Sequence, residues 1–177
     1  MLKLKFSLTA LFVIFLAGCV GIPDNVEAIN DFELERYLGR WYEIARLDHS
    51  FERGLSNVSA DYSMRDDGGV KVINRGFNDE EKKWEEAEGK AFFVETPDVG
   101  RLKVSFFGPF YGGYNIIELD KENYSFSMVC GPDTDYLWIL SRTPKMDETI
   151  LIELVNYASK LRFDTSELIF VDQSMNE

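Results

Sequence analysis

Histidine and cysteine are almost missing from this chain. Its 177 residues include one histidine, His49, and two cysteines, Cys19 and Cys130. These three residues are too few for a zinc site of the usual histidine and cysteine pattern. Two cysteines are also too few for a framework of several disulfides. Phosphate-binding loops, dinucleotide fingerprints and Gly-x-Ser-x-Gly elbows are missing too. We therefore expect no metal, no cofactor and no catalytic residue.

Positive charge is also scarce. Lysine and arginine number 19 against 31 aspartate and glutamate residues, which gives a formal net charge of −12. Such an acidic chain is a poor partner for nucleic acid, whose phosphates are bound through lysine and arginine. It is equally a poor partner for anionic lipid headgroups, so we expect any membrane attachment to come from acyl chains.

Long hydrophobic runs are missing as well, because the stretch Phe6–Leu16 is too short to span a bilayer. It follows a short basic start and leads into Leu16-Ala17-Gly18-Cys19, which predicts a signal peptide over residues 1–18. These four residues resemble the lipobox of bacterial lipoproteins; an ordinary signal with a coincidental cysteine is the alternative. The resemblance implies that Cys19 is acylated. In such lipoproteins an aspartate directly after the acylated cysteine retains the protein at the inner membrane. Val20 stands at that position here, so the resemblance implies sorting to the outer membrane.

The remainder of the chain divides into a tether and one domain. Residues 19–31 have little periodicity and contain Gly21 and Pro23, so a lipidated tether is expected there. Residues 32–177 are enough for a single domain with its own core. If Cys19 is acylated, Cys130 has no intrachain partner, and a buried thiol in a strand is the ordinary expectation.

Eight short apolar or alternating segments follow one another, separated by turn residues. They cover residues 41–48, 58–64, 70–77, 84–94, 102–106, 114–119, 124–130 and 136–141. Links of a few residues make neighbouring strands antiparallel, and closing the sheet removes its exposed edges. We predict an all-β fold, an eight-stranded antiparallel up-and-down barrel, with a sandwich as the alternative.

One helix is expected after the strands. Asp147 is a suitable N-cap, and the helix then has one apolar face, formed by Leu151, Leu154, Val155, Ala158 and Leu161. Such a face must cover something, so the helix is predicted to pack on the outside of the barrel. Residues 168–171 are a candidate for a short closing strand.

Three short motifs stand in order along these segments. Gly39-Arg40-Trp41 opens the first strand, Thr134-Asp135-Tyr136 precedes the last, and Arg142 follows it. Together they resemble the lipocalin family over essentially the whole domain. The resemblance implies that Trp41 lies at the closed end of the barrel with Arg142 packed across it, a contact of about 0.5–2 kcal/mol. It also implies a structural role, without ligand contact, for Gly39, Trp41, Thr134, Asp135, Tyr136 and Arg142.

The inward-facing residues decide what such a barrel can hold. Strand parity predicts that the ligand-binding set is Ala45, Val58, Ala60, Tyr62, Val72, Phe93, Leu102, Val104, Phe106, Tyr114, Ile116, Trp138 and Leu140. This set is nearly uncharged, so an acyl chain suits it and a deeply buried ionised group does not. A polar head is expected near the open end, beside Tyr114 and Asn115. Periodicity alone also allows a solid core without a cavity.

These features predict an outer-membrane-anchored protein that stores or transports fatty acids or lysophospholipids in the cell envelope. One alternative is an isomerase-type lipocalin that uses Cys130. Another is a ligand-free envelope assembly protein in which the uncharged loop around residues 106–114 is an interface. The expected partners are the lipid ligand, the membrane and, by the resemblance, a second copy of the chain.

Overall fold

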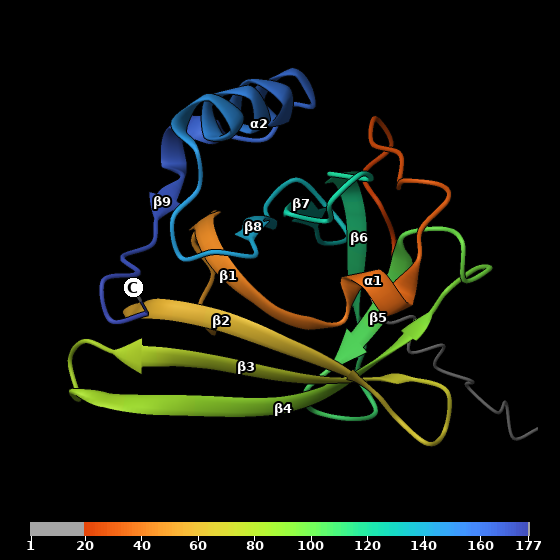
Figure 1. The fold of residues 1–177 in the computed structure, drawn as a ribbon, viewed down its shortest axis with the longest axis horizontal. Coiled ribbons are helices and arrows are strands. Elements are labelled where there is room, and N and C mark those ends of the chain that lie inside the picture. Colours follow the sequence, from red (N-terminus) through yellow and green to blue (C-terminus); the bar gives the residue numbers. More distant parts are fainter. Residues whose placement is uncertain (1–19, 177) are drawn as a thin grey trace, which may run out of the picture.

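The computed structural model describes residues 20–176, which form one barrel with a helix on its outside (Figure 1). The predicted signal peptide and Cys19 lie outside the described residues. The elements are α1 (Leu34–Tyr37), β1 (Gly39–Arg46), β2 (Leu55–Met64), β3 (Val70–Asn78), β4 (Lys83–Phe93), β5 (Arg101–Ser105), β6 (Gly112–Leu119), β7 (Phe126–Cys130), β8 (Leu137–Ser141), α2 (Glu148–Lys160), the 3₁₀ turn η1 (Thr165–Glu167) and β9 (Ile169–Phe170). Across residues 20–176, no helix has the length and apolar character needed to cross a membrane.

Strands β1 to β8 form a closed ring in which each strand pairs with its neighbours in sequence. β1 completes the ring, because it pairs antiparallel with β2 near Gly39 and with β8 up to Arg46. The predicted eight-stranded antiparallel barrel is confirmed, and the sandwich alternative is wrong. The two pairings are staggered along β1, with β2 at residues 39–42 and β8 at residues 42–46.

The predicted closing strand exists as β9, but it lies outside the ring and does not close it. β9 pairs with Ala45 and Arg46 of β1, beyond the point where β2 leaves β1. The C-terminal residues continue along this gap, where the Gln173 side-chain amide donates to the carbonyls of Glu43 (2.7 Å) and Val58 (2.8 Å). The end of the chain therefore joins β1 to the first residues of β2.

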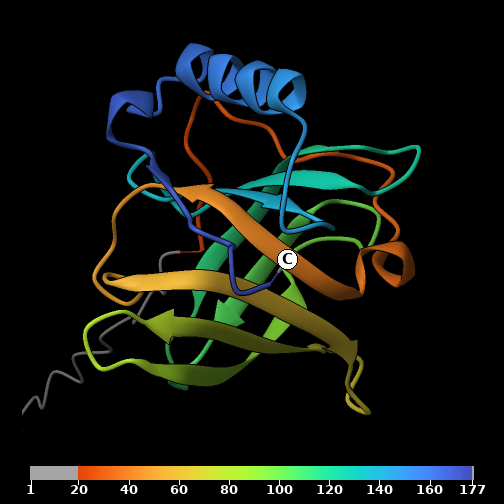
Figure 2. The same cartoon turned by 60° about the vertical axis from the view of Figure 1, so that its left-hand side comes forward.

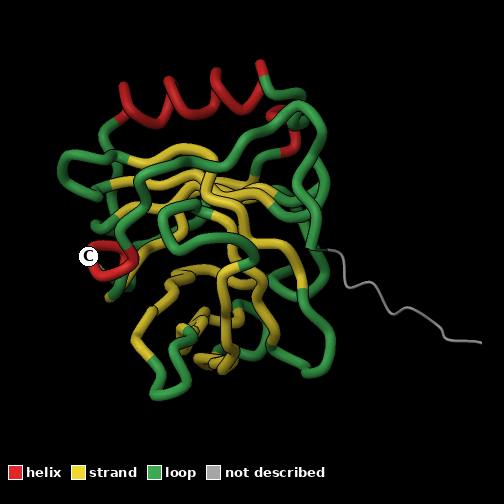
Figure 3. The backbone as a smooth tube through the Cα atoms, turned by 90° about the vertical axis from the view of Figure 1, so that its right-hand side faces the viewer, coloured by secondary structure: helices red, strands yellow, loops and turns green. Residues whose placement is uncertain are grey.

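Helix α2 lies across one side of the barrel (Figures 2 and 3). Asp147 caps it, because its carboxylate accepts hydrogen bonds from the amides of Thr149 (2.8 Å) and Ile150 (3.3 Å). Leu154 and Ala158 are buried in an outer core against β7 and β8. Packing of the helix on the outside of the barrel is confirmed.

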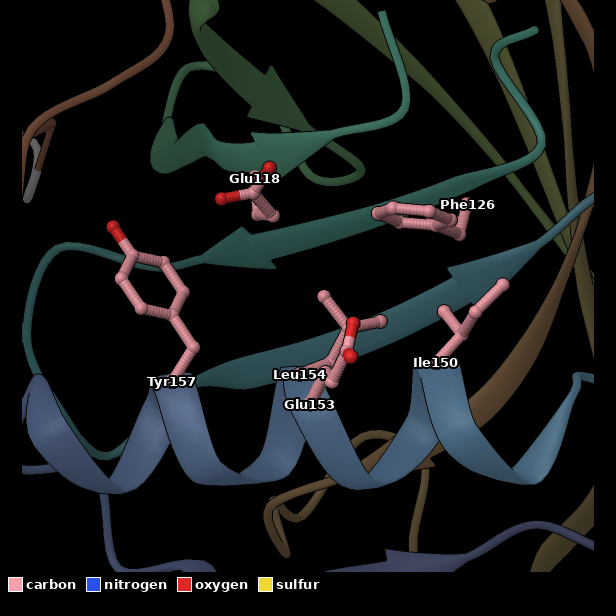
Figure 4. Close-up of a pocket in the computed structure, with 6 residues that line it drawn as sticks. All are labelled: Glu118, Phe126, Ile150, Glu153, Leu154 and Tyr157. Atoms are coloured by element: carbon pink, nitrogen blue, oxygen red, sulfur yellow. The ribbon is translucent and has the colours of Figure 1, made fainter.

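A shallow cavity of about 200 Å³ remains between α2 and the outer face of the sheet. Figure 4 shows Tyr157 and Ile150 of the helix facing Glu118 of β6 and Phe126 of β7. This cavity lies in the outer layer, separated from the barrel interior by the strands.

Residues 20–31, for which the sequence predicts a tether, are packed against the barrel wall. The Asn115 side-chain amide donates to the Gly21 carbonyl at 3.0 Å, and the amide of Ile29 donates to the Ile116 carbonyl at 2.9 Å. Val26 is buried in the outer core. The segment thus follows β6 up to α1 (Figure 1). The domain boundary at residue 32 stays a prediction, but these residues are part of the packed structure.

Candidate ligand-binding interior of the barrel

The closed end of the interior is built around Trp41, which is completely buried. Its indole donates to the Tyr37 carbonyl at 2.8 Å. The Arg142 guanidinium lies 3.9 Å from the indole centroid and donates to the carbonyls of Arg40 (2.9 Å) and Arg36 (2.7 Å). Gly39 has φ +91°, in the left-handed region that favours glycine. These contacts join α1, β1 and the end of β8 into a seal.

Above this seal, three tyrosine hydroxyl groups meet inside the barrel. The hydroxyl of Tyr114 lies 2.8 Å from that of Tyr37 and 2.9 Å from that of Tyr62, while Tyr37 donates to Ser127 at 3.2 Å. Burial raises the pKa of Tyr37 to about 12 and raises the pKa values of Tyr62 and Tyr114 as well. All three hydroxyl groups are therefore neutral, and they satisfy one another in an otherwise apolar region.

Most of the predicted inward residues do line one common core. The inner core contains, from the predicted set, Ala60, Tyr62, Val72, Phe93, Leu102, Val104, Phe106, Tyr114, Ile116, Trp138 and Leu140. Val58, the other member of the predicted set, is buried and lies beside Gly76. Gly76 is on the same face of β3 as the inward residue Val72, so Val58 lies on the inner side of the sheet as well. The sequence prediction omitted Phe32 and Tyr37, which enter the same core from the N-terminal segment.

Ala45 is the clear exception, and its prediction as an inward residue is wrong. The register of β1 against β8 shifts between Glu43 and Ala45, the mark of a β-bulge. As a result Ala45 pairs with Ile139 and belongs to the outer core, while Arg46 pairs with Trp138 and faces inward. A one-residue slip reverses the parity of everything that follows it.

The same bulge turns Arg46, at the C-terminal end of β1, into the interior, where it meets Glu43, a residue that precedes the bulge and already faces inward with Trp41. Arg46 is 2% exposed and Glu43 is 3% exposed, and they form an ion pair of 2.6 Å. Arg46 also donates to the carbonyls of Glu52 (2.9 Å) and Leu55 (3.2 Å). The expectation of a nearly uncharged interior is wrong at this end. The signal in the sequence was an acidic and a basic residue three positions apart within an apolar strand.

Residues of the β1–β2 connection complete this charged cluster. The indole of Trp138 donates to the Glu52 carboxylate at 3.1 Å, and His49 Nε2 lies 3.2 Å from the same carboxylate. Burial raises the pKa of Glu52; burial and then the charge of Glu52 raise that of Glu43, against the opposing effect of Arg46. Burial, followed by repulsion from Arg46, lowers the pKa of His49 to about 4. The histidine is therefore neutral near pH 7.

The two residues predicted to meet a polar head lie elsewhere. Tyr114 directs its hydroxyl toward Tyr37 and the sealed end. The Asn115 side chain faces the outside, where its amide donates to the carbonyls of Gly21 and Gly131, each at 3.0 Å. Parity explains the second error, because Asn115 alternates with the inward residues Tyr114 and Ile116 on β6.

Cys130 lies in the outer core with Leu137 and Ala158. Its thiol is buried, and burial raises its pKa to about 12. An isomerase mechanism that uses this cysteine inside the barrel is therefore contradicted. No cluster of three or more histidine, cysteine, aspartate or glutamate side chains arranged for a metal ion occurs within residues 20–176.

The segment Thr134-Asp135-Tyr136 lies before β8, at the end of the barrel opposite Trp41. The Tyr136 ring stacks on His49 (centroids 6.0 Å apart) and on Trp138 (6.2 Å), whereas Asp135 is exposed. The three motifs therefore support the barrel at its two ends, and only Trp41 belongs to the inner core.

The barrel resembles solved lipocalin structures. It superposes on insecticyanin from the tobacco hornworm with a TM-score of 0.69 at 23% identity, over 88% of each chain. A cockroach allergen, Per a 4, gives a TM-score of 0.66 at 18% identity over 85% of this chain and 94% of the other. Similarity at these identities defines the fold class alone.

The sequence defines the family more narrowly. Residues 32–173 match the lipocalin-like domain model, so the chain belongs to the lipocalin-like family. It is similar to the outer membrane lipoprotein Blc of Vibrio cholerae, with 56% identity over 90% of this chain and 94% of that protein. The Blc protein of Escherichia coli is 51% identical over 98% of this chain and 97% of its own. These findings confirm the lipocalin resemblance and the predicted location at the outer membrane.

Proposed function

We propose that this protein binds lipid at the outer membrane and holds the acyl chain of a fatty acid or a lysophospholipid inside its barrel. In this role it stores or transports such lipids in the cell envelope. The observation that carries the proposal is the inner core itself, to which all eight strands of the ring contribute apolar or tyrosine side chains.

Several inward residues retain contact with solvent, which supports the presence of space for a ligand. Ala60, Phe93, Val104 and Trp138 are only partly buried, although they pack against the inner core. A small side chain such as that of Ala60 leaves volume between larger neighbours. Burying about ten methylene groups there contributes roughly 8 kcal/mol of gross transfer free energy, before ordering costs are subtracted.

The orientation of the lipid follows from the two ends of the interior. Trp41, Arg142 and α1 seal one end, so a chain enters from the other, beside the β1–β2 connection. The head would then remain near Glu43, Arg46 and Glu52, where polar groups already interrupt the apolar lining. Tyr114 and Asn115, the residues expected from the sequence, do not form this end.

The test is lipid binding by two matched variants on the same strand. Ala60→Phe adds a ring on the inward face of β2, whereas Ser63→Phe adds one at an exposed position of that strand. We expect Ala60→Phe to weaken displacement of a fluorescent fatty acid about tenfold or more, because it occupies the space of the acyl chain, and Ser63→Phe to bind as the parent does. Native mass spectrometry with lysophospholipid gives the stoichiometry. Absence of bound lipid in the parent protein would reject the proposal.

The remaining alternative is an assembly protein with a solid barrel. It predicts that Ala60→Phe destabilises the fold strongly, because a filled core has no room for a ring. The lipid-binding proposal predicts instead a small change in stability together with a large loss of lipid affinity. Thermal unfolding of the two variants therefore separates the roles.

A further inference from the structure

The connection between β5 and β6 contains the most exposed aromatic side chains of the described structure. Phe107 is 81% exposed and Phe110 is 63% exposed, and the residues between them are exposed too. We call residues 107–111 (Phe-Gly-Pro-Phe-Tyr) the aromatic loop. It carries no charged side chain. Adjacent exposed aromatic residues on a soluble domain mark a surface that is covered by another apolar phase.

The N-terminal end of the described chain lies beside this loop. The Arg101 guanidinium donates to the Val20 carbonyl at 3.4 Å, and the Asn115 amide donates to the Gly21 carbonyl at 3.0 Å. A Cβ atom on Gly113 would stand 2.7 Å from the same Gly21 carbonyl oxygen. Gly113 is three positions after Phe110, so their Cα atoms are at most about 11 Å apart.

This arrangement limits the distance between the barrel and a membrane anchor at Cys19. Cys19 precedes Val20 directly, and one peptide unit spans about 3.8 Å. Because Val20 and Gly21 are hydrogen-bonded to β5 and β6, no slack remains between the predicted acylation site and the barrel wall. An anchored protein must then rest against the bilayer with the side that carries the aromatic loop.

Two lysines lie on the strands beside the aromatic loop, and the acidic residue near Lys90 there, Glu88, is paired with Lys71 at 3.0 Å. Lys103 lies over the Tyr111 ring at 5.2 Å from its centroid. Lys103 and Lys90 alternate with the inward residues Val104 and Ala91 on their strands, so both face outward. Neither forms an ion pair with a residue in the described part of the chain. Two lysines beside exposed aromatic rings match the interface between headgroups and acyl chains.

We propose that the aromatic loop inserts into the surface of the bilayer that holds the Cys19 acyl chains, with Lys90 and Lys103 against anionic headgroups. The barrel is then fixed in orientation as well as in location. The inference depends on acylation of Cys19 and is independent of what the barrel binds.

The experiment uses the full acylated chain in vesicles of phosphatidylethanolamine and phosphatidylglycerol that contain nitroxide-labelled phospholipid. Phe107→Cys carries an environment-sensitive fluorophore, and Phe170→Cys on β9, where the native residue is 59% exposed, is the matched control. Cys130 is buried and does not compete for the label. We expect nitroxide lipids to quench the probe at position 107 at least several-fold more than the probe at position 170.

Two results would overturn the proposal. In the first, the probe at position 107 is quenched by aqueous iodide as efficiently as the control probe. In the second, it is shielded from iodide, not quenched by the lipids, and increasingly shielded at higher protein density, which would assign the loop to contact with a second copy. Lipid loading of the barrel is measured in the same samples by native mass spectrometry. A failure of membrane contact is thereby distinguished from a failure of ligand binding.

Discussion

Two arginines mark the two ends of the barrel interior, and they are held in different ways. Arg142 lies over the Trp41 indole, donates to main-chain carbonyls and keeps partial contact with solvent. Arg46 is almost fully buried and is paired with Glu43. The first charge remains hydrated, so its contacts add to stability. The second has lost its water, and its attraction to Glu43 mainly offsets that cost. The contacts of Arg142 therefore stabilise the closed end. At the other end, the stability of the charged cluster depends on each of its charged groups keeping its partner.

Arg46→Met should have the largest effect on stability. The substitution leaves the Glu43 carboxylate buried without its partner, which costs about 3–5 kcal/mol of unfolding free energy. Denaturation by urea, monitored by circular dichroism, measures this loss. The double variant Glu43→Gln/Arg46→Met should recover a large part of it, since it removes both charges. If the double variant is less stable than Arg46→Met by the full cost of a second independent substitution, the two groups are not coupled.

Arg142→Met should cost less, about 2 kcal/mol, because it removes a contact with Trp41 and hydrogen bonds at a partly hydrated site. The same urea titration measures it, and Arg142→Lys should fall between the parent and the methionine variant, since it keeps the charge and loses the planar fork. A loss equal to that of Arg46→Met would show that the two ends are held alike.

Tyr114→Phe tests the hydrogen bonds among the hydroxyl groups of Tyr37, Tyr62 and Tyr114 inside the barrel. The Tyr62 hydroxyl loses its only partner there, whereas Tyr37 keeps Ser127, so the expected cost is about 1 kcal/mol. Thermal unfolding of the variant checks this value. Tyr62→Phe/Tyr114→Phe should cost little more than the single variant, because the double variant removes the unsatisfied hydroxyl as well.

His49→Gln should change the pH dependence of stability more than its value at pH 7. The pKa of His49 is about 4 in the folded protein and near 6.5 in the unfolded chain. Between these values the unfolded state binds more protons, so this residue makes stability fall as the pH is lowered from 6.5 to 4. The variant should lose that contribution, seen as a shallower acid slope of the urea midpoint relative to the parent. Parallel curves would assign the acid sensitivity to other groups.

The strands and the helix could be predicted because alternation and turn residues are local properties. The eight strands lie where the pattern placed them, and Asp147 caps α2. The bulge in β1 was not predictable, since nothing in the local alternation marks the residue that is left unpaired. Its consequences, the outward Ala45 and the inward Arg46, followed from that one position.

For the candidate site too, some features could be predicted from the sequence and others could not. Inward orientation follows from strand parity, so most of the residues predicted to face inward lie in the inner core, while their contact with a ligand stays a prediction. Packing of residues 20–31 on β6 was missed because their contacts are made with residues distant in sequence, such as Asn115 and Ile116. The charged cluster was missed because Glu52 and His49 come from a connection whose path cannot be inferred from its composition.

The junction between the C-terminus and β1 has a consequence for biosynthesis. Strand β1 pairs with β2 near its start, but its remaining contacts are made with β8, β9 and Gln173 from the C-terminal part of the domain. Strand β1 can pair with β2 as soon as β2 has emerged, yet its pairing with β8 and β9 must wait for nearly the whole polypeptide. Such distant contacts slow folding, and the waiting edge is open to wrong partners meanwhile. The barrel therefore closes only once β8 and β9 are available, whichever hairpins form earlier.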